Sequence, residues 1–308
     1  MGEPIAQRGA YPALDGLLAL QHVARGLALG TTLRKSRSSG HLQTSVRGRG
    51  LEFAEVRQYQ PGDDIRSIDW RVTAKTQKTH TRLFTQERER PVILAADMRS
   101  NMFFGSQRCF KSVLCAEALS VLAWTAHSAG DKVGAVVMGD RDHLELKPSA
   151  SKRALLGTFQ ALVDFAAKLD APVAPETGHI QQLFARLLRV ARPGSAVFIV
   201  SDFYDFDSEC DKYLTQLSRH CEVTLVHVSD ALEWQLTGGG AQWLSDGEHT
   251  QLVRSQQVEQ QMQRRYSQLL QRCSRSSVEL LALQTAQDVA QPLGARYAAQ
   301  HKSLWRRA

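Results

Sequence analysis

"PVILAADMRSNM", residues 91–102, is the stretch that decides the fold of this chain. It opens with an apolar run that does not alternate between apolar and polar positions, and the run ends at Asp97. Similar runs follow at residues 131–139, 195–202, 222–230 and 277–285, mostly separated by helical stretches. Such Val/Ile/Leu runs are typical of strands that are covered on both faces. We therefore predict an α/β fold, with a doubly wound, mostly parallel sheet and helices on both of its faces.

Three further segments refine this prediction. Residues 109–130 are apolar on almost every side, which predicts a helix buried between the sheet and its neighbours and ended by Gly130. Residues 144–150 predict an extra strand, antiparallel to the one before it. A later Gln/Arg-rich helix carries an apolar stripe that we interpret as a core-facing surface rather than a cofactor site, made of Val258, Met262, Tyr266, Leu270 and Cys273.

The first 90 residues have a different pattern. Residues 11–30 predict a short helix, and residues 31–50 are basic, rich in Ser and Gly and poor in apolar residues, as an exposed loop is. Residues 51–59 and 79–90 have strand-like patterns. We expect residues 1–90 to form an N-terminal helix, a basic loop and a small β-rich extension, and residues 91–308 to form the α/β domain.

The composition is that of a folded protein, with 43% hydrophobic and 22% charged residues among 308. The five cysteines include no CxxC pair, which argues against a zinc site or a disulfide framework and favours reduced thiols. We find no basic and then apolar leader and no apolar run of about 18 residues. We therefore expect a cytoplasmic protein without a membrane anchor.

The net charge of +7 favours acidic partners. Much of the excess lies in residues 33–50 and 301–308, and no nucleic-acid-binding signature accompanies it. We interpret these segments as solvated, solubilising stretches, and the pattern disfavours a nucleic-acid partner.

Candidate chemistry lies where two predicted strands end, because ligands of open α/β sheets bind at the carboxyl ends of the strands. Asp97 closes one strand, and Ser201 and Asp202 close another. A strand, its Asp, a short loop and a helix resemble the frame of a von Willebrand factor A (vWA) domain. In that family a DxSxS loop holds Mg²⁺ through oxygen ligands, as suits a hard cation.

The loop of this chain reads "DMRSNM", with Arg99 and Asn101 at the two serine positions. Two interpretations follow. In the first, the loop is a degenerate form of the vWA metal site in which oxygens of Asp97, Ser100, Asn101 and Asp202 hold Mg²⁺. In the second, which we favour, Arg99 pairs with Asp97 or Asp202 and replaces the ion. We therefore expect no cofactor.

"YQPGDDIRSIDW", residues 59–70, is a dense cluster of acids that resembles an active site. Each part of it has a structural use. Pro61 and Gly62 favour a turn, Asp63 or Asp64 can cap a short helix, and Ile65 and Ile68 would share a buried face with Trp70 as a further anchor. No His or Cys lies nearby, so we interpret the cluster as a structural clasp rather than a catalytic site.

The chain closely resembles the bacterial family called "domain of unknown function 58". The resemblance is carried by "RGRGLEFAEVRQYQPGDDIRSIDWRVTAKT", "FTQERERPVILAADMRSNMFFGS" and "FKSVLCAEALSVLAW", and it covers roughly residues 40–250. The motif residues are Glu52, Phe53, Arg57, Tyr59, Pro61, Gly62, Asp63, Asp64, Arg66, Ile68, Asp69 and Trp70.

The resemblance implies a vWA-like fold and a partnership with a MoxR-type AAA+ ATPase in assembling or maturing other proteins. We therefore expect a non-enzymatic, chaperone-like adaptor that binds this ATPase and a client protein. Two other functions stay open. One is a Mg²⁺-dependent phosphohydrolase that uses Asp97, although the loop lacks the second Asp of the DxDxT motif. The other is a basic nucleic-acid-binding protein.

Overall fold

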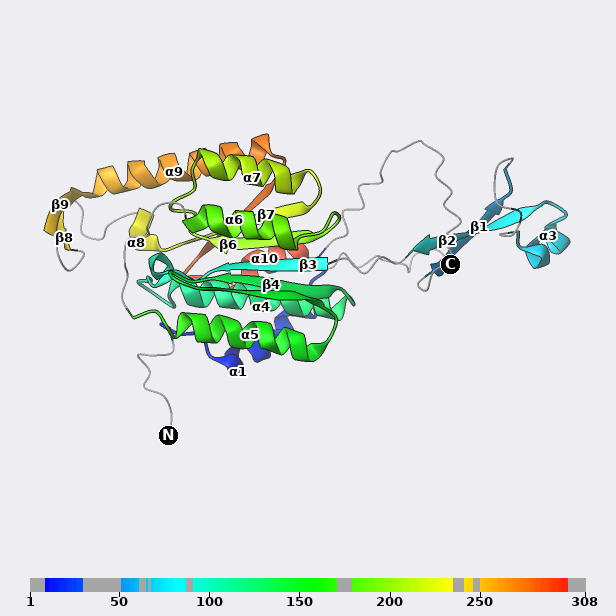
Figure 1. Ribbon diagram of the computed structural model, residues 1–308, viewed down its shortest axis with the longest axis horizontal. Coiled ribbons are helices and arrows are strands. Elements are labelled where there is room, and N and C mark those ends of the chain that lie inside the picture. Colours follow the sequence, from blue (N-terminus) through cyan, green and yellow to red (C-terminus); the bar gives the residue numbers. More distant parts are fainter. Residues whose placement is uncertain are drawn as a thin grey trace, which may run out of the picture. The chain divides into compact units, whose positions relative to one another are not determined.

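The computed structural model describes residues 9–29, 51–60, 65, 68–86, 91–170, 179–234, 241–245 and 250–298 (Figure 1). The chain divides into two compact units. The larger unit comprises Met1–Gly30 and Arg90–Ala308, and the smaller unit comprises Thr31–Glu89.

The larger unit is built on one sheet of six strands, in the order β10-β7-β6-β3-β4-β5. All neighbouring strands are parallel except β4 and β5, which are antiparallel. The predicted fold class is therefore confirmed, including the extra antiparallel strand. The strands are β3 (Pro91–Asp97), β4 (Lys132–Met138), β5 (His143–Ser149), β6 (Ala196–Ser201), β7 (Glu222–Ser229) and β10 (Glu279–Gln284).

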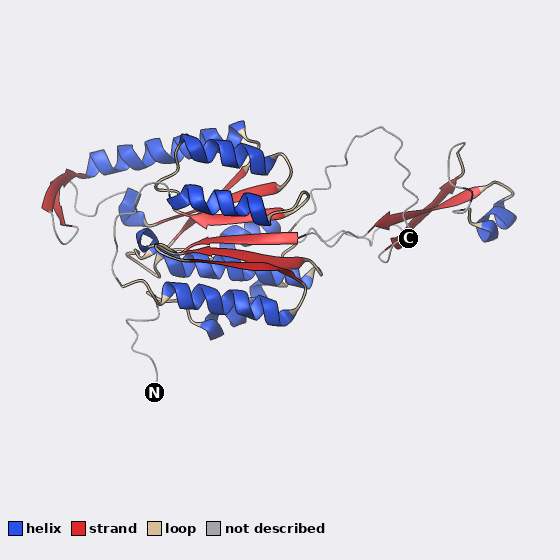
Figure 2. Cartoon of the chain, viewed as in Figure 1, coloured by secondary structure: helices blue, strands red, loops and turns tan. Residues whose placement is uncertain are grey.

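Helices cover both faces of this sheet and create two separate cores (Figures 1 and 2). Helix α6 (His179–Val190) shows how the core on the second face forms, because Ile180, Leu183, Phe184 and Leu187 follow the helical repeat and are all buried. The first face carries α1 (Leu14–Ala19), α2 (Gln21–Ala24), α4 (Lys111–Ser128), α5 (Lys152–Ala166) and α10 (Ala290–Tyr297). The second carries α6 (His179–Val190), α7 (Ser208–Ser218) and α9 (Ser255–Arg275).

Helix α4 is the central helix of the first face. Fifteen of its eighteen residues are buried, as the apolar character of residues 109–130 predicts. It ends next to Gly130, whose φ of 85° lies in the left-handed region that glycine adopts without a steric penalty. Because α4 is enclosed by the sheet and by other helices, its first residue, Lys111, is buried as well.

The N-terminal helices belong to the larger unit, so the predicted domain boundary at residue 90 is wrong for residues 9–29. Leu17 of α1 is only 2% exposed. Its carbonyl oxygen accepts hydrogen bonds from Ser120 Oγ at 2.7 Å and Trp124 Nε1 at 3.3 Å. After α2, Ala28 N donates to the carbonyl oxygen of Tyr297, the last residue of α10, at 2.8 Å. The short apolar helix α1 is stabilised by packing against α4, and the sequence pattern does not reveal this packing.

The smaller unit is an antiparallel hairpin of β1 (Leu51–Gln58) and β2 (His80–Gln86) with the short helix α3 (Trp70–Thr76) between the strands. Asp69 caps α3 by accepting from Arg71 N at 3.0 Å and Val72 N at 3.1 Å. For Glu52, Phe53 and Arg57 the structure describes only the backbone. The predicted turn and caps at Pro61, Gly62, Asp63 and Asp64, and the side chain of Arg66, lie outside the described residues.

The predicted shared burial of Ile65, Ile68 and Trp70 is wrong. Ile68 is 6% exposed, because it bridges to Thr81 of β2. Ile65 is 66% exposed and Trp70 is 67% exposed. Helix α3 turns Val72 and Thr73 inward, so Trp70 at its first position faces outward. Tyr59 holds the other end of the segment through its N–H, which donates to Thr79 O at 2.8 Å.

Helix α9 follows a second hairpin, β8 (Ala241–Ser245) and β9 (Thr250–Arg254). Its predicted core-facing stripe is shifted by one residue near the end, because Leu269 is buried and Leu270 is 45% exposed. Within the part of the chain that the structure describes, none of the helices combines the length and the apolar character that a membrane crossing requires.

Candidate functional site

Three neighbouring strands of the sheet end in an aspartate on the edge where an α/β ligand site is expected. Asp97 ends β3, while Asp202 and Asp230 directly follow the last residues of β6 and β7. Asp97 and Asp230 are fully buried. Since a buried carboxylate is costly unless a cation or hydrogen-bond donors satisfy it, the partners of these groups determine the chemistry of this edge.

Asp97 is satisfied by Arg99, from the loop that follows its own strand. Arg99 Nε donates to Asp97 Oδ1 at 2.8 Å, and Nη2 donates to Oδ2 at 2.8 Å. The backbone N–H of Arg99 adds a bond of 3.2 Å to Oδ1, and Ser201 Oγ donates to Oδ2 at 2.6 Å. Both oxygens of Asp97 are therefore occupied by groups of the chain itself.

The same guanidinium also holds Asp205, from the loop after β6. Arg99 Nη1 lies 2.9 Å from Asp205 Oδ2 and Nη2 lies 3.0 Å from Oδ1. Asp205 Oδ2 in turn accepts from Ile180 N, at the first turn of α6, at 3.1 Å. Arg99 is only 1% exposed. One buried cation thus joins two carboxylates and three elements.

Electrostatics keep Arg99 charged in this position. Burial by itself lowers the pKa of an arginine, but the charge of Asp97 and the hydrogen bonds of both carboxylates outweigh it and raise the pKa of Arg99. The geometry does not fit Mg²⁺, because the guanidinium occupies the space between Asp97 and Asp205 where a cation would find its oxygen ligands. Arg99 pairs with Asp97 and Asp205, and not with Asp202.

Asp202 has its own buried cation, Lys111 at the start of α4. Lys111 Nζ lies 2.8 Å from Asp202 Oδ2 and 2.6 Å from Glu233 Oε1. Asn101 Nδ2 donates to the other oxygen of Asp202 at 2.8 Å. Burial raises the pKa of Asp202, but Lys111 and these hydrogen bonds outweigh it and lower the pKa. For Lys111 burial lowers the pKa, and the two carboxylates outweigh it and raise the pKa.

The four residues of the predicted metal site are divided among three contacts. Asp97 is bonded to Arg99, and Asp202 is bonded to both Lys111 and Asn101. Ser100 turns away, since its N–H donates to Asp140 Oδ1 at 3.0 Å and its hydroxyl bonds the same carboxylate. Among the described residues, no group of three or more His, Cys, Asp or Glu residues is arranged to hold a metal ion.

Asp230, the third aspartate at these strand ends, is held by hydroxyl and backbone donors. Ser106 donates to it through its N–H at 2.8 Å and through its hydroxyl at 2.6 Å, and Leu232 N adds a third bond of 2.9 Å. The hydroxyl of Thr285 is a further donor. All three aspartates are therefore satisfied internally by an arginine, a lysine or hydroxyl and backbone donors.

Sequence reasoning missed Lys111, Asp205, Asp230 and Glu233 as members of this edge. The available signal for Asp205 and Asp230 was an aspartate within a few residues of a strand end. A lysine in the first turn of an otherwise apolar helix was the signal for Lys111, because such a helix cannot bury a cation without nearby acids.

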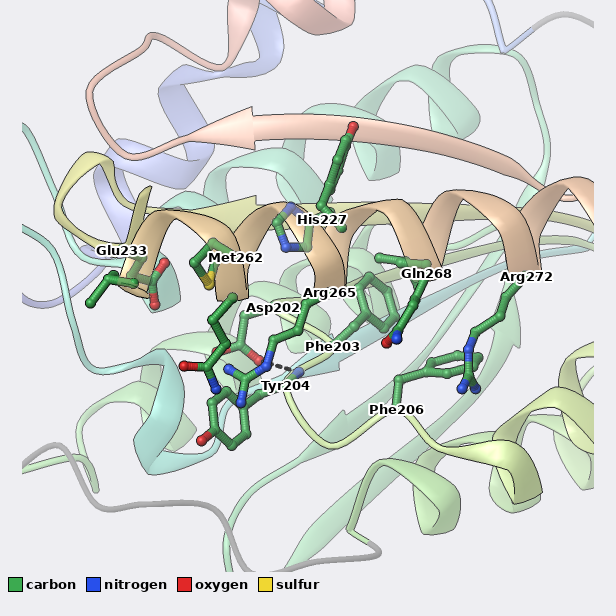
Figure 3. A pocket seen from close by; sticks show the side chains of 14 residues that line it. Asp202, Phe203, Tyr204, Phe206, His227, Glu233, Met262, Arg265, Gln268 and Arg272 are labelled. Atoms are coloured by element: carbon green, nitrogen blue, oxygen red, sulfur yellow. Dashed lines mark hydrogen bonds between the residues drawn. The ribbon is translucent and has the colours of Figure 1, made fainter. Parts of the chain in front are cut away.

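Beside Asp202 lies a cavity of about 360 Å³ between α9 and the ends of β6 and β7 (Figure 3). Figure 3 shows Arg265 of α9 over Tyr204 and next to Asp202, whereas Gln268 of the same helix lies near Phe203 and Phe206. Phe203 in that loop has a φ of 50°, which is strained for a bulky residue and is held by a bond of 2.9 Å from its N–H to Ser201 Oγ. The apolar stripe of α9 therefore lines a cavity as well as the core.

His227 of β7 lies at the inner end of this cavity and gives a testable pH dependence. Its Nδ1 is buried without a hydrogen-bond partner among the described residues. Burial lowers the pKa of His227 to about 4; nearby Asp202 opposes this and Lys111 adds to it. Below pH 6.5 the unfolded chain therefore binds a proton that the folded chain does not, and stability falls as the pH drops from 6.5 towards 4.

We expect this difference to amount to about 2 kcal/mol of unfolding free energy between pH 7.5 and pH 5, because the slope rises to about 1.4 kcal/mol per pH unit only below pH 6.5. Urea denaturation of the wild type and of His227→Gln at pH 7.5 and pH 5 measures it. The variant should lose less stability on acidification. An equal loss in both proteins would show that His227 does not carry the effect.

Comparisons with known proteins place the chain in a family. The family model described as "Protein of unknown function DUF58" matches residues 55–276. Uncharacterized proteins of Mycobacterium bovis and Mycobacterium tuberculosis are each 30% identical to the chain over 203 residues. The match covers 66% of this chain and 62% of each relative, so the chain spans less than two thirds of the length of these curated relatives.

Among solved structures, the conserved hypothetical protein BatB from Bacteroides thetaiotaomicron has a TM-score of 0.42 and 14% identity, covering 67% of this chain and 98% of that one. An aerotolerance-related membrane protein from Bacteroides fragilis has a TM-score of 0.43 and 13% identity, covering 67% and 96%. Likenesses of this size say nothing about the chemistry of this chain.

Proposed function

This chain belongs to the DUF58 family of proteins of unknown function, and from that premise we propose that it is a non-enzymatic protein-interaction module. In this proposal it acts as an adaptor of a MoxR-type AAA+ ATPase in the assembly or maturation of other proteins. The observation that carries the non-enzymatic part is Arg99, a buried cation that occupies the space between Asp97 and Asp205.

The internal ion pairs favour a module that binds its partners without a metal. A vWA-like frame offers a sheet edge to a ligand, and here the carboxylates of that edge are bonded to Arg99, Lys111 and Ser106. The carboxylates of this edge are therefore held in place by two buried cations and by hydroxyl and backbone donors of the chain itself. Binding would then depend on surfaces and on the neighbouring cavity, as in protein recognition, rather than on a metal-bound acid.

The same geometry weighs against the phosphohydrolase. A nucleophilic aspartate needs an oxygen that can approach phosphorus, whereas both oxygens of Asp97 accept hydrogen bonds and the residue is fully buried. Turnover of p-nitrophenyl phosphate with Mg²⁺ by the wild type, lost in Asp97→Asn, would support the enzyme instead of the adaptor.

The nucleic-acid alternative rests on residues 33–50 and 301–308, which lie outside the described residues. It stays a prediction with a direct test. Binding through these segments would weaken steeply with added salt, and an electrophoretic shift that is absent at low salt would exclude it.

The choice of partner rests on the family resemblance, and two assays with the cognate ATPase test it. In the first, the ATPase is immobilised and capture of the full chain is measured. In the second, the rate of ATP hydrolysis is measured with and without the chain. We expect capture and a changed hydrolysis rate. The adaptor proposal fails if the ATPase neither captures the chain nor changes its rate.

A further inference from the structure

The cavity beside α9 contains a cation whose charge no other described residue neutralises. Arg265 is half-buried, and its guanidinium lies 4.1 Å from the centre of the Tyr204 ring. Among the described residues it has no carboxylate partner, in contrast to Arg272 of the same helix, which pairs with Asp211 at 3.1 Å. Since a guanidinium has five N–H donors and no acceptor, Arg265 is prepared to bind a planar acceptor from outside.

The walls around Arg265 combine aromatic and apolar side chains with polar ones. Phe203, Phe206, Met262, Tyr266 and Leu269 line the cavity together with His227 (Figure 3). Its volume of about 360 Å³ is at the small end of the range for ligand pockets, which begins at about 300 Å³. The cavity therefore suits one apolar side chain and a neighbouring polar group rather than a large cofactor.

The charges favour a monoanion. At one end of the cavity Asp202 and Glu233 share the single cation of Lys111, which leaves that end with a net charge of −1 and would repel a dianionic phosphate. Arg265 lies on α9, a helix with four arginines and one glutamate, so its net charge is +4 − 1 = +3. A carboxylate approaching along α9 meets a favourable potential and finds its partner at Arg265.

We propose that this cavity binds an acidic peptide segment of a partner protein. In the bound state the guanidinium of Arg265 holds a carboxylate of the segment through charge-assisted hydrogen bonds. An adjacent apolar side chain of the segment enters the space between Tyr266, Phe206 and Met262. This assignment rests on the proposed interaction function and names the surface and the partner chemistry through which it operates.

NMR signals of the methionine methyl groups can report directly on ligand binding in the cavity. The chain has five methionines. Met98, Met102 and Met138 are buried in the cores, Met1 lies outside the described residues, and Met262 lines the cavity. In protein labelled with ¹³C at the methionine methyl groups, Met262→Leu identifies the resonance that reports on the cavity.

The probes are the acetylated dipeptide amides Phe-Glu and Glu-Phe, with Phe-Gln and Gln-Phe as matched neutral probes and phenyl phosphate as a dianion. We expect Phe-Glu or Glu-Phe to shift the Met262 resonance saturably, with a dissociation constant on the order of 1 mM, as small ligands of this size give. The neutral peptides and phenyl phosphate should bind at least about tenfold more weakly.

Two variants separate the role of Arg265 from the general charge of α9. Arg265→Gln should weaken binding of the acidic peptides at least about tenfold. Arg264→Gln removes the same charge from the next, exposed position and should leave binding nearly unchanged. An unchanged melting temperature of Arg265→Gln would confirm that the loss reflects recognition.

Several results would overturn the proposal. These are no shift of Met262 with either acidic peptide, equal binding of acidic and neutral peptides, stronger binding of phenyl phosphate, or equal affinities of the wild type and Arg265→Gln. The outcome is independent of the ATPase assays. Peptide binding without capture by the ATPase would reject the MoxR partnership and keep the site, whereas capture without peptide binding would reject the site alone.

Discussion

Arg99→Met is expected to lower the free energy of unfolding by about 3–5 kcal/mol, among the largest effects of any single substitution in the larger unit. The methionine keeps most of the side-chain volume but removes the cation. Asp97 and Asp205 then remain buried, close together and both negative. The cost comes from these uncompensated charges more than from the lost attraction, because a buried ion pair in water-free surroundings roughly offsets its own desolvation.

The measurement is urea denaturation followed by circular dichroism, with Arg189→Met as the matched control. Arg189 pairs with Glu145 at 2.9 Å but is 66% exposed, so its loss should change the unfolding free energy by no more than about 0.5 kcal/mol. Adding Asp97→Asn to Arg99→Met should recover part of the deficit. If Arg99→Met were as stable as Arg189→Met, Arg99 would not be the group that neutralises this edge.

Lys111→Met should have a comparable effect, of about 3–5 kcal/mol, through the second buried cation. Lys111 is 2% exposed and holds Asp202, which is 8% exposed, as well as Glu233. Without the ammonium, Asp202 keeps the donor of Asn101 and the N–H of Tyr204 at 3.1 Å, but none of its described partners carries a positive charge. Lys111, at the first position of α4, is therefore required to neutralise carboxylates that lie outside the helix.

A double-mutant cycle tests this explanation. Asp202→Asn removes the buried negative charge, so it should restore much of the stability lost in Lys111→Met, with a coupling energy of at least about 1 kcal/mol. Lys212→Met is the control: Lys212 pairs with Glu209 at the surface and is 72% exposed, and its replacement should leave the melting temperature unchanged. Additive losses in Lys111→Met and Asp202→Asn would contradict the pairing.

The sheet could be predicted from the sequence because parallel strands covered on both faces must be apolar along their whole length. Residues 91–97 and 195–202 show this pattern, and they form β3 and β6 next to each other. The position of α1 could not be predicted. Its burial depends on contact with Ser120 and Trp124, which are more than 100 residues away in the sequence. The local sequence pattern around α1 does not indicate such long-range contacts.

The candidate site was predicted in part. The sequence placed Asp97 and Arg99 together, because they are two residues apart and follow a strand. It did not reveal Asp205 as the second partner of Arg99, because that contact depends on the conformation of the loop after β6, in which the N–H of Phe203 donates to Ser201 Oγ. For residues 59–70, the apolar side chains of Ile65, Ile68 and Trp70 suggested burial and anchoring, whereas Ile65 and Trp70 are largely exposed. For Trp70, hydrophobicity alone does not say which side of the two-turn helix α3 faces inward.

We infer that the guanidinium of Arg99 takes the place of a divalent cation at this sheet edge. Thermal denaturation with and without MgCl₂ tests it most directly, in the wild type and in Arg99→Ser. A ligand that binds only the folded state raises the melting temperature. We predict that Mg²⁺ leaves the wild type unchanged, and that it raises the lowered melting temperature of Arg99→Ser, where Asp97, Asp205 and a new hydroxyl are free to bind it. A rise in the wild type that Asp97→Ala abolishes would contradict the account.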